Sequence, residues 1–102
     1  MSDIRQAREA LVQRIVDGAG QSAFSERRAA FQNSGLSGPM GALVDKVARH
    51  AWQVTDGDIA AAKASGRSED QIFEIVVCAA VGQATRQIDT AIAALEIAIG
   101  RE

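Results

Sequence analysis

Few side chains in this sequence could take part in acid, base or nucleophilic chemistry near neutral pH. His50 is the only histidine, Cys78 is the only cysteine, and tyrosine is absent. Histidine titrates near neutral pH and could serve as a base. Glu74 stands within the apolar run QIFEIVVCAAV, where burial could raise its pKa and suit it to proton transfer. The first candidate chemistry is therefore acid/base catalysis by Glu74 and His50.

Each of these residues also has a structural explanation. A histidine beside an apolar stripe is more often hydrogen-bonded and partly buried than catalytic. Glu74 could instead form a salt bridge with Arg86, Arg49 or a neighbouring subunit, because a buried carboxylate needs a partner. The apolar neighbours of Cys78 disfavour a thiolate, so we expect a buried and unreactive thiol.

Composition argues against several other classes of site. A single cysteine cannot form an intramolecular disulfide or a multi-cysteine zinc site. Asp56 and Asp58 are too few for a metal cage, and helix capping explains both. The net charge of −2 provides no concentrated basic face for nucleic acid. The only basic pair, Arg27 and Arg28, is interpreted as part of a solvated helix face.

The same composition predicts where the protein resides. No apolar stretch reaches the roughly 18 residues that span a bilayer, and the N-terminal sequence is too charged to be a signal peptide. We therefore expect a cytoplasmic protein with no cofactor, no metal, no nucleic-acid partner and no membrane partner.

The elements that must position the candidate residues are predicted to be helices. The chain has 102 residues, of which 47% are hydrophobic, and it contains one proline. This composition fits a single all-α domain over 1–102, divided into N-terminal helices, 1–37, and a core, 38–100. Turn and capping residues predict helices over 3–17, 23–32, 39–53 and 55–65, and a fifth that begins after residue 68.

Two apolar stripes and one cap define the earlier helices. Ser2 is expected to cap the first helix. Its apolar face is predicted at Ile4, Ala7, Leu11 and Ile15. The helix that opens at Pro39 has apolar residues at helical spacing, namely Met40, Leu43, Val44, Val47 and Ala51.

Two capping boxes frame the later helices. Thr55 and Asp58 form the first box, and Gly66 ends the short helix that follows. Ser68 and Gln71 form the second box and start an apolar helix. A β-strand is the rival interpretation of residues 75–77, but the cap and the continuing 3.6-residue period favour a helix. At Gly82 this helix could bend, or two helices could meet.

The fifth helix is apolar on nearly every side, which indicates burial against more than one neighbour. A chain of about 100 residues cannot easily surround such a helix by itself. We therefore expect the surplus apolar surface to form a subunit interface in a symmetric homo-oligomer.

Residues 42–95 resemble the carboxymuconolactone decarboxylase family, which includes the alkylhydroperoxidase D-like proteins. The similarity lies in the order of the runs ALVDKVARHA, AKASG and SEDQIFE, followed by a long apolar helix. The resemblance implies an all-helical bundle with a central antiparallel helix pair, assembled as trimers or hexamers.

The catalytic positions of that family differ in this sequence. Peroxidase-type members carry the motif CxxCxxxH before the glycine that corresponds to Gly66. Counting back from Gly66 places Asp58 at the histidine, and Val54 and Ala51 at the two cysteines. Without the thiol pair there is neither a peroxidatic sulfur nor a resolving partner.

The decarboxylase-type motif is also absent, because Asp58 replaces its histidine and Gly82 replaces its tyrosine. Glu74 alone matches the acidic residue of the family. The resemblance therefore implies a helical oligomer without redox cysteines, serving as a small-molecule-binding protein or as an accessory or structural protein. The alternative is an enzyme with rewired acid/base chemistry on a lactone or carbonyl substrate, using Glu74 and His50.

Overall fold

A computed structural model describes the backbone of residues 2–100 and the side chains of residues 6–100. Over this range the chain is all-α, with five α-helices and no strand, as the sequence predicts. The helices are α1 (Ser2–Asp17), α2 (Phe24–Gln32), α3 (Gly38–Arg49), α4 (Asp56–Ala64) and α5 (Glu69–Gly100), with a 3₁₀ turn, η1 (Ala51–Gln53), before α4. The predicted roles of the Ser2 and Ile4 side chains fall outside the described residues.

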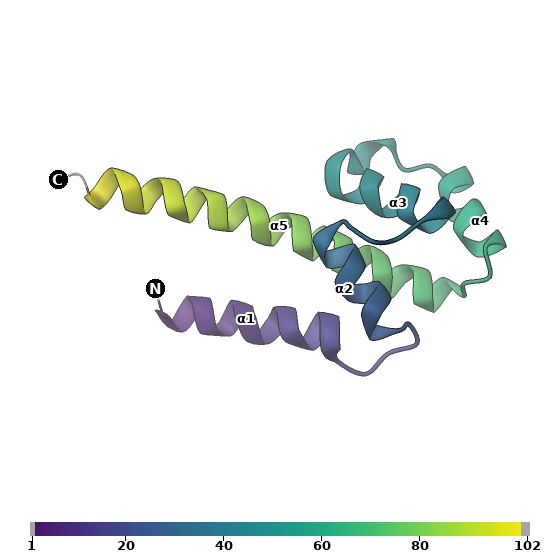
Figure 1. Ribbon diagram of the computed structural model, residues 1–102, viewed down its shortest axis with the longest axis horizontal. Coiled ribbons are helices and arrows are strands. Elements are labelled where there is room, and N and C mark those ends of the chain that lie inside the picture. Colours follow the sequence, from purple (N-terminus) through teal and green to yellow (C-terminus); the bar gives the residue numbers. More distant parts are fainter. Residues whose placement is uncertain (1, 101–102) are drawn as a thin grey trace.

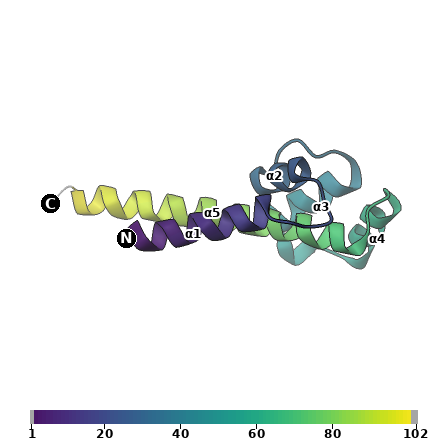
Figure 2. The same cartoon turned by 90° about the horizontal axis from the view of Figure 1, so that it is seen from below.

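Helix α5 is the spine of an elongated molecule that measures 55 × 29 × 20 Å. Helices α2, α3 and α4 gather around its first half (Figure 1). Helix α1 runs antiparallel to α5 and lies beside its second half, and the last turns of α5 extend past the start of α1 in both views (Figures 1 and 2). The two halves of one helix therefore have very different surroundings.

Both predicted capping boxes are present. The Thr55 hydroxyl accepts a hydrogen bond from the Asp58 amide, and the Asp58 carboxylate accepts one from the Thr55 amide at 2.9 Å. In the second box the Gln71 amide donates to the Ser68 hydroxyl at 3.1 Å, and the Ser68 amide donates to the Gln71 side chain at 2.9 Å. These bonds satisfy amides that the first turn of a helix leaves unpaired.

The core lies between α3 and the first half of α5. The predicted face of α3 supplies three buried side chains, Met40, Leu43 and Val44. Helix α5 supplies four more, Ile72, Ile75, Cys78 and Ala79. Helix α3 ends at Arg49 instead of continuing to Gln53, because the backbone leaves helical geometry at His50. Ala51, the last residue of the predicted stripe, is consequently exposed.

Gly82 neither ends nor divides the fifth helix, because α5 is a single α-helix of 32 residues. Gly82 instead lies at the point where α5 crosses α2. A Cβ atom at this position would lie 1.9 Å from the carbonyl oxygen of Phe31. Only glycine allows the two helices to approach this closely.

The predicted face of α1 is wrong in part. Ile15 packs on the core as predicted, but Ala7 and Leu11 are exposed, and Val12 and Val16 pack on the core in their place. Residues 12, 15 and 16 also have helical spacing, so a rotation of the helix by about one residue, 100°, exchanges one stripe for the other. Val12 and Val16 face α2 and α5, which decide the choice in the folded chain.

Candidate functional site

Glu74 is held by the loop between α1 and α2. Its carboxylate accepts hydrogen bonds from the Gln21 amide at 2.9 Å, from the Ser22 amide at 2.8 Å and from the Ser22 hydroxyl at 2.6 Å. Gly20 permits this approach, since a Cβ atom there would lie 2.7 Å from Oε1 of Glu74. One carboxylate on α5 thereby fixes the turn that brings α2 back across the same helix.

These hydrogen bonds decide the charge of Glu74. The Gln21 amide, followed by the Ser22 hydroxyl, holds the pKa of this carboxyl below its ordinary value, and nearby Arg27 acts in the same direction. Burial therefore does not raise the pKa of Glu74, which was the condition for its role in proton transfer. Of the alternative salt-bridge partners, the two within the chain are engaged elsewhere, because Arg86 donates to the Phe31 carbonyl at 2.5 Å and Arg49 pairs with Asp45 at 3.1 Å.

Arg27 lies beneath the same loop and is 3% exposed, so its assignment to a solvated face is wrong. Its guanidinium donates to the carbonyl oxygens of Gly18 at 2.7 Å and Ile15 at 3.3 Å. It also lies 4.7 Å above the ring of Phe24. The last carbonyls of a helix lack backbone partners, and a buried arginine can satisfy several of them. Arg28, by contrast, is exposed and pairs with Asp17 at 2.7 Å.

Cys78 lies one turn after Glu74 and is fully buried, as the sequence predicts. Its Sγ atom is 3.7 Å from the carbonyl oxygen of Ile15. Burial raises the pKa of the thiol, so the reactive thiolate is disfavoured. Cys78 is a packing residue between α5 and the end of α1.

His50 is placed apart from the Glu74 cluster. It is exposed at the end of α3, where its ring meets the ring of Trp52 edge-on at a centroid distance of 5.3 Å. Trp52 is itself 78% exposed, so it does not pack in the core. All hydrogen bonds described for Glu74 go to residues 21 and 22. The structure therefore does not bring Glu74 and His50 together at one reaction centre.

Asp58 functions as a cap and an ion-pair partner. Besides its bonds to Thr55, it accepts a hydrogen bond from Nζ of Lys46 on α3 at 2.9 Å. Lys46, followed by the Thr55 amide, lowers the pKa of the Asp58 carboxyl. Asp58 thus ties α4 to α3.

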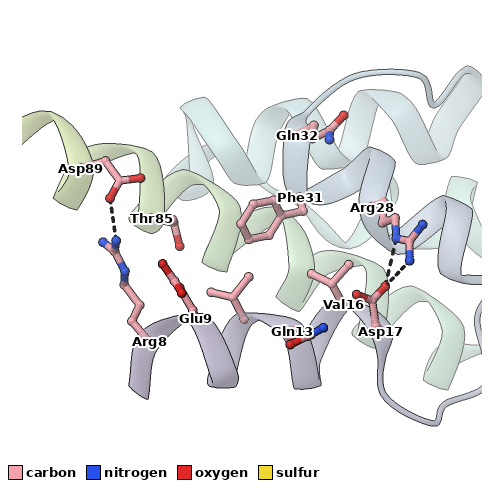
Figure 3. Close-up of a pocket in the computed structure, with 11 residues that line it drawn as sticks. Arg8, Glu9, Gln13, Val16, Asp17, Arg28, Phe31, Gln32, Thr85 and Asp89 are labelled. Atoms are coloured by element: carbon pink, nitrogen blue, oxygen red, sulfur yellow. Dashed lines mark hydrogen bonds and ion pairs between the residues drawn. The ribbon is translucent and has the colours of Figure 1, made fainter. Parts of the chain in front are cut away.

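A cleft of about 460 Å³ opens where α1, α2 and α5 meet. Its apolar lining residues are Val12, Val16 and Phe31, and Figure 3 shows Val16 of α1 pointing toward Phe31 of α2. An ion pair of Arg8 with Asp89, at 2.8 Å, stands at one end, and the pair of Arg28 with Asp17 stands at the other. The sequence does not reveal this cleft, because its walls come from three helices that are distant in the chain.

The described residues contain no group of three or more His, Cys, Asp or Glu side chains that could hold a metal ion. None of the helices in residues 2–100 combines the length and apolar character that a membrane crossing requires. Comparison of the chain with protein-family models, with curated proteins and with solved structures found no match. The family resemblance therefore stays a prediction from the sequence.

Proposed function

We propose that this chain is a subunit of a non-redox helical homo-oligomer with an accessory or structural role. The observation that carries the proposal is the uncovered apolar surface of the second half of α5. Four large side chains there are between 46% and 60% exposed, namely Ile88, Leu95, Ile97 and Ile99. Ile88, Leu95 and Ile99 share one side of the helix by their spacing, and a contiguous apolar patch is typical of an interaction site.

Assembly would remove much of this surface from water. Full burial of one leucine or isoleucine side chain contributes about 1.5–3 kcal/mol. Several such side chains on each copy supply enough free energy to offset part of the entropy lost on association. Catalysis receives less support, because Glu74 is ionised and hydrogen-bonded, Cys78 is buried, and His50 lies apart from both.

The finer form of the proposal is an alkylhydroperoxidase D-like bundle, with α3 and α5 as its central antiparallel pair, assembled as a trimer or hexamer. Two observations support it. Both capping boxes lie within the stretch that carries the resemblance, and α3 and the first half of α5 supply most of the buried core. A carboxymuconolactone decarboxylase-like subunit that has lost its thiols would keep this framework.

Light scattering coupled to size exclusion tests the assembly. At micromolar concentration the chain of 10.7 kDa should elute with a mass that is a multiple of this value. A monomeric mass over the whole concentration range would refute the proposal. A variant with Gln53 changed to Glu serves as the control, because this exposed residue lies in η1, whose contacts are with α3.

Small-molecule binding in the α1–α2–α5 cleft is a second candidate, favoured by the size of the cleft. Ligand sites commonly enclose about 300–1,000 Å³ over an apolar floor with a few polar groups. Here Glu9 and Thr85 line the cleft together with the apolar side chains of Val12 and Phe31. Small aromatic amines titrated into ¹⁵N-labelled protein should shift the amides of these residues. Shifts confined to other surfaces would exclude this site.

A further inference from the structure

The cleft between α1, α2 and α5 carries more negative than positive charge. Among the described residues that line it are three carboxylates and two guanidinium groups. Arg8 pairs with Asp89 at 2.8 Å. Arg28 pairs with Asp17 at 2.7 Å, so each arginine is neutralised by an aspartate of the same lining. Glu9 is the remaining carboxylate, and a ligand with one positive charge would balance it.

Glu9 and Thr85 line the cleft from opposite helices. In Figure 3 the Glu9 side chain extends from α1 toward α5, and the Thr85 side chain extends from α5 toward α1. Within the described part of the chain, neither the Glu9 carboxylate nor the Thr85 hydroxyl has a hydrogen bond or an ion pair. Both groups can therefore bind a ligand without giving up a partner in the protein.

The apolar part of the lining favours a ligand with a flat, apolar body. Val12 and Val16 of α1 and Phe31 of α2 supply this part. Aromatic rings attract one another beyond the effect of the area that they bury. The face of an aromatic ring also attracts a nearby positive charge. Phe31 therefore suits both a ring and a cationic group on the same ligand.

We propose that the cleft binds a primary amine with an aromatic body, whose ammonium group lies between the Glu9 carboxylate and the Thr85 hydroxyl. This inference rests on the small-molecule site proposed above and specifies the chemical class of its ligand. A primary ammonium group has three N–H donors. It can donate one to Glu9 and one to Thr85 and keep the third for water, while its ring packs against Phe31.

Other classes of ligand fit this lining less well. A carboxylate ligand would be repelled by Glu9, and the arginines of the cleft already bind aspartates. A quaternary ammonium ligand brings the positive charge but has no N–H group to donate. An alcohol could bond to Thr85 but would leave the charge of Glu9 unbalanced. Hydrogen bonds that involve charged groups are stronger than neutral ones, so the primary amine should be preferred.

Titrations with four probes of similar shape test the class of ligand. The probes are phenethylamine, its trimethylammonium derivative, phenethyl alcohol and hydrocinnamate, each added to ¹⁵N-labelled protein. Phenethylamine should shift the amides of Glu9, Phe31 and Thr85. It should bind about tenfold more tightly than each of the other three probes, which is the ratio that one hydrogen bond to a charged group supplies.

Two variants that remove the same charge distinguish the site from the net charge of the protein. Glu9→Gln should weaken the binding of phenethylamine about tenfold and leave that of phenethyl alcohol unchanged. Asp56→Asn is the matched control, because this exposed residue begins α4, which packs on α3 and α5. It should leave the affinity for phenethylamine unchanged. Both variants should keep the circular dichroism spectrum of the wild type, since both side chains are exposed.

The outcomes separate this inference from the proposed small-molecule site. A preference for phenethylamine that is lost in Glu9→Gln and kept in Asp56→Asn supports the amine site. Shifts at the cleft without that preference, or equal affinities of the two variants for phenethylamine, would overturn the amine class and leave a binding cleft standing. No shift of the cleft amides with any of the four probes would overturn both.

Discussion

The two halves of α5 are similar in composition and opposite in burial. The first half, 69–82, contains five buried residues, and the second half, 87–100, contains none within the described chain. Both are rich in aliphatic residues, with valine most frequent in the first half and isoleucine and alanine in the second. The difference arises at Gly82, where α2 crosses at the closest approach and then turns away. Apolar sequence makes a helix capable of burial, but the elements that cross it decide where burial occurs.

The α1–α2 loop explains why the crossing is fixed at this place. Glu74 holds residues 21 and 22, and Arg27 ties α2 to the last carbonyls of α1. Beyond Arg86, which donates to the Phe31 carbonyl of α2, helix α1 lies beside α5, and the ion pair of Arg8 with Asp89 joins these two helices. One face of the first half of α5 is thus buried within the chain, while the large apolar side chains of the second half lie exposed.

The largest expected effect comes from Gly82→Ala. The added Cβ would collide with the backbone carbonyl of Phe31, which cannot move without displacing α2. We expect a loss of about 3 kcal/mol or more in the free energy of unfolding. Urea denaturation followed by circular dichroism measures it. Gly100→Ala is the matched control in the uncovered half, where a Cβ atom meets nothing, and should change stability by no more than about 1 kcal/mol. Equal losses in the two variants would contradict the contrast between the halves.

A smaller loss is expected from Glu74→Gln, about 2 kcal/mol, because hydrogen bonds to a charged acceptor are lost or weakened. The effect should depend on pH. Since the folded pKa of Glu74 lies below the ordinary value of 4.5, its contribution is complete above pH 4.5 and declines as the pH falls through the folded pKa. The stability gap between wild type and Glu74→Gln should therefore narrow in acid. If the difference in free energy of unfolding between the two proteins stays constant from pH 7 to pH 3, the charge of the Glu74 carboxylate does not contribute to stability.

Thiol reactivity compares the two halves directly. Cys78 is buried and its pKa is raised, so it should react with a disulfide reagent at least about 100-fold more slowly than a cysteine introduced at the exposed position Thr90. Stopped-flow absorbance of Thr90→Cys should show one fast and one slow thiol per chain. The slow thiol should become fast in guanidinium chloride. Two fast thiols in the native protein would mean that the first half of α5 opens freely.

The smallest effect on the isolated fold is expected from Leu95→Ser. Leu95 is exposed in the single chain, so the change should alter the stability of the monomer by less than about 0.5 kcal/mol. Its effect on assembly should be much larger, because it places a hydroxyl in the proposed contact. Light scattering should show a shift toward 10.7 kDa with an unchanged circular dichroism spectrum. An unchanged oligomer would remove Leu95 from the interface.

Much of the fold follows from local sequence. The two capping boxes, the glycine that ends α4 and the apolar face of α3 are set by residues within a few positions of one another. The choice between the two stripes of α1 could not be predicted, because it depends on α2 and α5. The role of Gly82 was equally hidden, since a glycine in a helix looks the same whether it bends the helix or admits a neighbour.

The candidate site was harder to predict than the fold. Glu74 was predicted as a candidate site residue because it is a carboxylate in an apolar helix. Its hydrogen-bond donors, however, are backbone amides more than fifty residues earlier in the chain. Arg27 was assigned to the solvent because arginine is usually exposed, and no local pattern shows that it would cap α1. Burial of Cys78 was predicted correctly, because its own apolar neighbours determine it.

Hydrogen exchange along α5 at several protein concentrations tests the central claim most directly. Amides of residues 69–82 should stay protected at every concentration, because the chain itself covers them. Amides of residues 87–100 should be protected in the oligomer and should exchange progressively faster as dilution separates the subunits. Rapid exchange of 87–100 that does not depend on concentration would contradict the account, since it would mean that no second copy covers this half of the helix.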